Sequence, residues 1–150
     1  MRRLLALVLW LAACQAETPE WQHWSAVAAS KHEEADQLID HGQRRQAGER
    51  LEEVVATAPR ELNDVARALL QDTYFRLARL QLEEHEPAMA LRQAEAGLSL
   101  AGNDSLFVAN LLVVQGAAQE ALGNGTAALA AYQRALRINE ALLHDTLGRP

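Results

Sequence analysis

Three stretches of the chain share one spacing of apolar and small residues, and this repetition restricts the fold more than any other feature. In each stretch, four such residues follow one another at intervals of four, three and one. The three sets are Ala47, Leu51, Val54 and Val55; Ala90, Ala94, Gly97 and Leu98; and Ala128, Tyr132, Ala135 and Leu136. Such spacing places each set on one face of an α-helix. We therefore expect a helical unit that repeats about three times.

Further positions repeat in the same register. Twelve residues before each leading alanine stands a small residue, and five residues before it stands a residue that we expect in a turn. The small residues are Ala35, Ala78 and Gly116, and the turn residues are Gly42, His85 and Gly123. Two helices approach closely only where a side chain is a methyl group or a hydrogen atom. The repeated unit is therefore expected to be a helical hairpin that closes on its small residues.

Apolar periodicity predicts six helices and no strands. Their expected ranges are 19–42, 44–58, 60–83, 87–100, 105–122 and 126–143. Thr18 is the expected N-cap of the first helix, with Pro19 at its first helical position. The third helix is expected to be unusually long, because the helical pattern continues through the residues that separate the first two repeats. Only 5% of residues are aromatic while 49% are hydrophobic, so alanine and leucine, both strong helix formers, supply most of the apolar surface.

This pattern resembles the tetratricopeptide repeat over residues 28–59, 71–102 and 109–140. Pro59 stands where that repeat carries its terminal proline, and Tyr74 stands where it carries an aromatic residue. The offsets between repeats are 43 and 38 residues, against the usual 34 or so. The resemblance implies an all-α solenoid of antiparallel helix hairpins, with about three repeats and six helices, over residues 19–147. Another kind of helix-pair solenoid and a plain helical bundle remain as alternatives.

In tetratricopeptide repeats the first helix of each hairpin lines a groove that binds a partner. Carried over by position, the resemblance implies a groove formed by Ala29, His32, Asp36, Ile39, Asp72, Phe75, Arg79, Leu82, Asn110, Val113, Ala117 and Glu120. Such a mixed surface suits an extended peptide or a partner helix. Phe75 and Arg79 are the expected central anchors, since both residue types can contribute strongly to binding. In the alternative interpretation, Phe75 belongs to the core and Arg79 is an ordinary surface charge.

The N-terminal residues have the plan of a secretory signal. Arg2 and Arg3 precede an uncharged apolar run, residues 4–13, which is too short to serve comfortably as a permanent transmembrane helix. The run ends in Leu11-Ala12-Ala13-Cys14, which resembles the bacterial lipobox.

The lipobox resemblance implies cleavage before Cys14 and attachment of lipid to its sulfur. Residues 1–13 would then be a lipoprotein signal peptide, and residues 14–18 would form the lipidated N-terminus and a short tether. Gln15 after the cysteine favours the outer membrane in enterobacterial sorting. The alternative is ordinary signal cleavage, for example after Ala16.

Two tryptophans follow the tether on one helical face. Trp21 and Trp24 are expected either to cover the open apolar end of the first hairpin or to contact a membrane interface or a partner.

Other classes of function find little support. The net charge of −6 and the lack of a basic cluster argue against nucleic acid as a partner. The chain has no phosphate-binding glycine loop, no nucleophile elbow and no His-Glu-x-x-His sequence. His32 and Asp36 lie one helical turn apart, but two residues make a weak metal site. We therefore expect no catalytic residue, no metal site and no cofactor.

The sequence predicts a lipoprotein of a bacterial cell envelope that faces the periplasm and acts as an adaptor rather than an enzyme. Its partners would be other envelope proteins or peptides, together with the lipid bilayer through acylated Cys14. One alternative is a regulatory accessory subunit of cell-wall enzymes or proteases. Another is a structural lipoprotein that forms homo-oligomers, because Leu142, Leu143 and Leu147 would leave an apolar end.

Overall fold

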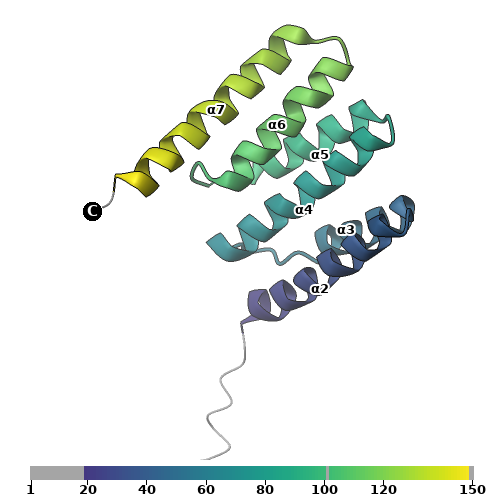
Figure 1. Cartoon of the computed structure of the whole chain (residues 1–150). Helices are drawn as coiled ribbons and strands as arrows, with labels where there is room; N and C mark the ends of the chain where they lie inside the picture. The colour runs from purple at the N-terminus through teal and green to yellow at the C-terminus, as the bar shows by residue number, and fades with distance from the viewer. Residues whose placement is uncertain (1–18, 101, 149–150) are drawn as a thin grey trace, which may run out of the picture.

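Six helices and no strand make up the part of the chain that the computed structural model describes, residues 19–100 and 102–148. The helices are α2 (Glu20–Asp40), α3 (Arg44–Ala56), α4 (Asp64–Glu83), α5 (Pro87–Ser99), α6 (Leu106–Ala121) and α7 (Gly125–Leu147). Consecutive helices pair as three antiparallel hairpins, and the hairpins stack side by side in chain order (Figure 1). The all-α helix-hairpin solenoid predicted from the sequence is therefore confirmed.

The turns inside the three hairpins have one structure. Gly42, His85 and Gly123 occupy the left-handed region, with φ of 74°, 61° and 80°. In each turn the next residue's N–H reaches a carbonyl five residues earlier over 2.8 Å, in the pairs Gln43–Leu38, Glu86–Gln81 and Asn124–Gln119. This is the Schellman motif, which ends a helix at a left-handed residue. The turn positions inferred from the repeat are thus equivalent in space.

The small residues of the repeat are buried at the contacts between helices. Ala47 and Ala90 are 0% exposed and Ala128 is 4% exposed. Ala35, Ala78 and Gly116 are also buried. A Cβ atom added to Gly116 would lie 2.5 Å from Cε1 of Tyr132, so α6 and α7 meet where a ring covers a bare backbone. A larger residue at this position would push the two helices apart.

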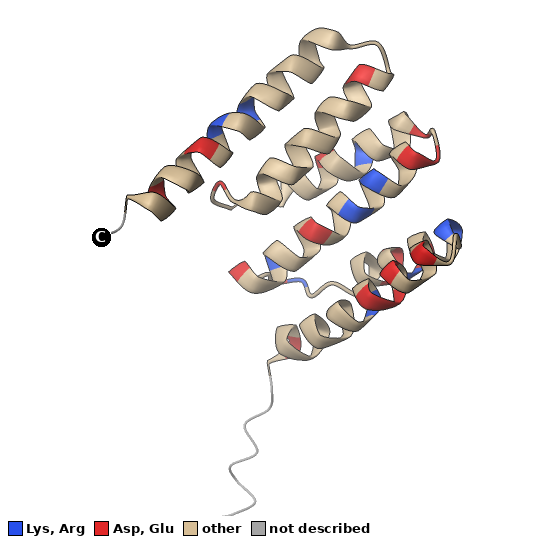
Figure 2. Cartoon of the chain, viewed as in Figure 1, with Lys and Arg blue, Asp and Glu red and all other residues tan. Residues whose placement is uncertain are grey.

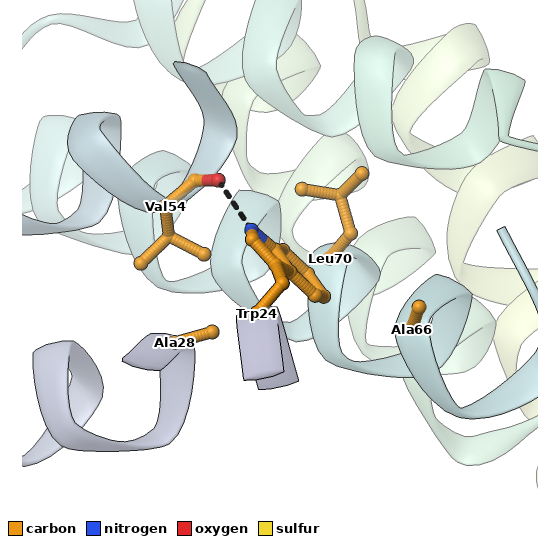
Figure 3. Packing of buried hydrophobic residues seen from close by; sticks show 5 residues of the cluster. All are labelled: Trp24, Ala28, Val54, Ala66 and Leu70. Atoms are coloured by element: carbon orange, nitrogen blue, oxygen red, sulfur yellow. Dashed lines mark hydrogen bonds between the residues drawn. The ribbon is translucent and has the colours of Figure 1, made fainter. Parts of the chain in front are cut away.

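Trp24 joins the first hairpin to the second. Its side chain is 5% exposed and packs with Ala28, Val54, Ala66 and Leu70, from α2, α3 and α4 (Figure 3). The indole Nε1–H donates to the carbonyl oxygen of Val54 over 3.4 Å (Figure 3). The structure therefore supports the packing interpretation of Trp24. Trp21 is half-buried against the same cluster.

The predicted start of the third helix was wrong. The sequence pattern began it at residue 60, whereas α4 begins at Asp64. Asn63 is the N-cap, and its Oδ1 accepts a hydrogen bond of 2.8 Å from the N–H of Ala66. This cap satisfies a backbone donor that a helix start leaves free. Of the residues that separate the first two repeats, 60–63 therefore belong to a non-helical connection, whereas 64–70 lengthen α4 as expected.

Both ends of the helical region also differ from the prediction. Pro19 is the N-cap of α2 rather than its first helical residue, and Thr18 lies outside the described residues. At the other end, α7 continues one turn beyond residue 143 to Leu147. No proline or glycine interrupts this turn, and the N–H of Gly148 closes it on the carbonyl oxygen of His144 over 2.8 Å.

We predict that Ala128→Leu destabilises the fold by about 1–3 kcal/mol, because the larger side chain overpacks the contact of α7 with α6. Ala130→Leu is the matched control, since Ala130 lies exposed on another face of the same helix. Denaturant titration of the two variants measures the difference. Equal losses of stability would contradict the observed register of α7.

Candidate functional site

A polar network lies where α2 crosses α4. His32 of α2 is 6% exposed, and its Nε2 lies 2.8 Å from Oγ1 of Thr73. The Thr73 hydroxyl donates its hydrogen to the carbonyl oxygen of Leu69 over 2.8 Å, so it accepts from His32. This assignment places the proton of neutral His32 on Nε2. The opposite nitrogen, Nδ1, then faces Oδ2 of Asp72 at 3.4 Å.

Arg76 links this network to the exposed side of the first hairpin. Its Nε lies 2.7 Å from Oδ2 of Asp72, and its Nη1 lies 2.8 Å from Oδ1 of Asp36 on α2. One guanidinium thus holds a carboxylate of its own helix and one of the preceding hairpin. A second ion pair between the hairpins joins Arg44 to Glu83 at 3.5 Å. Figure 2 shows acidic and basic residues on the ribbons of α2 and α4, the two helices that this network joins.

His32 is held neutral by its surroundings. Burial lowers the pKa of His32 below its ordinary value of 6.5, and the positive charge of Arg76 lowers the pKa further. Asp72 and Asp36 act in the opposite direction. A neutral imidazole fits the hydrogen bond that it donates to Thr73. Protonation would place a second charge beside the guanidinium of Arg76.

Phe75 and Arg79 form a second group on the exposed side of α4. The guanidinium carbon of Arg79 lies 5.9 Å from the centroid of the Phe75 ring, within the range of a cation–π contact. Arg79 also approaches Glu83, with 3.8 Å between Nε and Oε1. The Arg79 side chain is 52% exposed. Phe75 is half-buried against the cluster that joins the second and third hairpins. Its ring is therefore both a core element and a support for the exposed guanidinium.

The predicted groove residues of α6 occupy the equivalent positions one hairpin further on. Val113, the counterpart of Phe75, is 44% exposed. Asn110 is half-buried, and exposed Glu120 accepts a hydrogen bond of 3.0 Å from the hydroxyl of Tyr132. We call the surface formed by Asp36, Phe75, Arg79, Val113 and Glu120 the first-helix face, because all five residues lie on α2, α4 or α6.

The structure brings only part of the predicted groove into one network. His32 lies beside Asp72, and Arg76 connects Asp72 to Asp36. Arg76 and Thr73, which complete this network, were not among the predicted residues. The spacing of Asp72 and Arg76 is the four-residue interval of a helical ion pair, so that contact was detectable in the sequence. The contact of Arg76 with Asp36 depends on how two hairpins stack, so no local sequence pattern predicts it.

Comparison of the chain with protein-family models and with curated proteins gave no match. In the part of the chain that the structure describes, no three histidine, cysteine or acidic side chains gather as a metal site would require. No helix there is long and apolar enough to cross a membrane. Cys14 and the signal predicted around it lie outside the described residues.

We predict that acid weakens the junction of the first two hairpins. His32 has a lower pKa when folded than the value near 6.5 of the unfolded chain, so its contribution to stability is present above that value. The contribution is lost as the pH falls through the unfolded value towards the folded one. His32→Gln keeps a neutral donor but does not titrate, so its stability should change less between pH 7.5 and 5.5, about the range in which histidine titrates.

Denaturant midpoints measured at several pH values test this expectation. His23→Gln is the matched control, because His23 is exposed on the same helix. If the His32 and His23 variants keep the same pH dependence as the original chain, buried His32 is not the titrating group.

Proposed function

We propose that the chain is a membrane-anchored adaptor of the bacterial envelope, and that its first-helix face binds a segment of another envelope protein. The observation that carries this proposal is the cation–π pair of half-buried Phe75 and exposed Arg79 on α4, in the middle hairpin. Arginine and aromatic residues are frequent binding anchors. Both residues lie on α4, which packs against helices of the preceding hairpin and of the following one.

The chemistry of the first-helix face supports a peptide or a helix as the bound segment. Arg79 has one carboxylate neighbour at 3.8 Å, so its planar group keeps donors for a carboxylate or a backbone carbonyl of a partner. Val113 adds exposed apolar surface on α6, and Asp36 adds a half-exposed carboxylate on α2. A ligand that crosses the three helices would meet acidic, basic and apolar positions in turn.

The lipobox-like sequence supports the anchor. Cys14 precedes the first helical residue, Glu20, by six residues. A chain of six residues spans at most about 20 Å when extended. A lipidated Cys14 would therefore hold the first hairpin close to the bilayer and confine any bound partner to the membrane surface.

We predict that Cys14→Ala abolishes lipid labelling and blocks lipoprotein-type cleavage of the expressed chain. Ala16→Leu is the discriminating control. A bulky residue at position 16 would block ordinary signal cleavage after that residue, since signal cleavage requires small residues, but it would leave cleavage before Cys14 unaffected. Metabolic labelling with a fatty acid and mass analysis of the mature N-terminus measure both effects. An unlabelled original chain whose cleavage stops in the Ala16→Leu variant would overturn the anchor.

We predict that Arg79→Ala reduces capture of the partner from membrane extracts at least several-fold, with a change in stability of no more than about 0.5 kcal/mol. The small effect on stability follows from the exposure of the side chain. Arg92→Ala is the matched control, because Arg92 is an exposed arginine on α5, outside the first-helix face. Quantitative affinity capture and thermal unfolding are measured on the same preparations.

Capture that stays unchanged in both Arg79→Ala and Arg79→Glu would remove the first-helix face from the proposal. Replacement of Phe75 is a less direct test, because the ring also packs against buried residues.

A further inference from the structure

The last helix carries an apolar stripe that no other part of the described chain covers. Leu129, Leu136, Leu143 and Leu147 are 57%, 58%, 59% and 75% exposed. Their spacing of seven, seven and four residues aligns them along one narrow face of α7, as in the seam of a coiled coil. Among the described helices, α7 packs only against α6 and forms the edge of the stack (Figure 1). We call these four residues the leucine stripe.

The repeat shows what kind of surface the leucine stripe is. Leu129 and Leu136 are the counterparts of Leu91 and Leu98 on α5, each 38 residues earlier. Leu91 packs against the cluster that contains Val114 of α6, and Leu98 packs against the cluster that contains Val108 and Leu112. Through these two positions, α5 of the second hairpin packs against α6 of the third. The stripe on α7 is thus a helix-docking surface of the solenoid, with its leucines open to solvent.

The other end of the stack does not complement this surface. The α6 residues Leu111, Val114 and Ala118 help to receive α5. Their counterparts on α2 are Ser30, Glu33 and Gln37, which are polar and exposed. Only Val27, 40% exposed, offers a large apolar side chain there. A head-to-tail contact between copies would therefore bury leucines against polar groups, which is unfavourable.

We propose that the chain forms a two-fold dimer in which α7 of two copies packs antiparallel along the leucine stripe. Leu136 is the middle residue of α7, so a two-fold axis through it overlaps the whole helix. Leu136 then meets its own copy, and Leu129 meets Leu143 of the second copy. Between these contacts Tyr132 faces Glu140 of the second copy on one side of the seam, and Gln133 faces Asn139 on the other. No two like charges oppose in these pairs.

The size of the surface is sufficient for a modest dimer. A helix of 23 residues is about 34 Å long, and a strip about 10 Å wide along two such helices covers roughly 700 Å² before the relief of the side chains is counted. That value falls within the class below about 1,200 Å², to which weak and transient complexes belong, so the dimer is expected to be weak. Confinement to one membrane raises the effective concentration of two copies without a new contact. The dimer itself requires neither the lipid nor the first-helix face.

Cysteine cross-linking of the full chain in its membrane tests the dimer and its geometry. Leu136→Cys should form a disulfide-linked dimer by itself, because a residue on a two-fold axis meets its own copy. Leu129→Cys and Leu143→Cys should each remain monomeric alone, since fourteen residues, or about 21 Å, separate each from its copy. Co-expression of these two variants should produce the mixed dimer.

The original chain, with Cys14 as its only cysteine, and Ala130→Cys, which lies on another face of α7, are the controls and should give no such product. Three results would overturn the proposal. The first is a Leu136→Cys chain that stays monomeric. The second is a Leu136→Cys chain linked to a different protein, which would assign the stripe to a partner helix. The third is self-linking of Leu129→Cys as strong as that of Leu136→Cys, which would indicate another arrangement.

Sedimentation of the purified full chain in detergent gives an independent measurement. The original chain should shift from monomer to dimer as its concentration rises through the micromolar range. Leu136→Glu should stay monomeric at least ten-fold higher in concentration, with unchanged helical content because the side chain is exposed. Ala130→Glu should behave as the original chain. A monomeric original chain at every concentration, or equal association of both glutamate variants, would contradict the dimer.

Discussion

Close contact between helices at alanine and glycine holds each hairpin together, and the rest of the structure depends on it. Gly116 shows the constraint most directly, because the ring of Tyr132 occupies the space that any side chain would need. Dispersion forces are short-ranged, so a separation of the helices by up to about an ångström already loses a quarter to a half of the attraction at such contacts. The short distance between the two helices of a hairpin also lets the next hairpin contact α3 or α5. Stacking, and with it the first-helix face, therefore follows from the size of a few residues.

The two junctions between hairpins differ in chemistry although their backbones repeat. Apolar clusters and two cross-hairpin ion pairs, Asp36–Arg76 and Arg44–Glu83, join the first hairpin to the second. Apolar clusters also join the second hairpin to the third, but no ion pair crosses that junction among the described residues. Partly exposed ion pairs add little stability and are sensitive to salt. The first junction is accordingly the one that pH and salt affect, and the second is set by packing.

The parts of this fold that local pattern dictates were predictable, and the parts that depend on distant contacts were not. Gly42, His85 and Gly123 were assigned to turns from their place in the repeat, because few backbone conformations can end a helix there. The start of α4 was misplaced because apolar periodicity continues through Leu62, whereas the cap at Asn63 decides where the helix begins. The pairing of Arg76 with Asp36 spans forty residues and depends on how two hairpins stack. The predicted groove residues lie on α2, α4 and α6, but the contacts that join some of them were not predicted.

The position of Trp24 has a consequence for the order in which the chain acquires structure. Contacts within a hairpin are local in sequence, so a chain that emerges N-terminus first, from a ribosome or from a translocation channel, can pair α2 with α3 early. Trp24 packs not only on that hairpin but also on Ala66 and Leu70, which follow later in α4. Its indole therefore stays partly in water until those residues have emerged. Completion of the first hairpin is thereby coupled to the arrival of the second during vectorial folding.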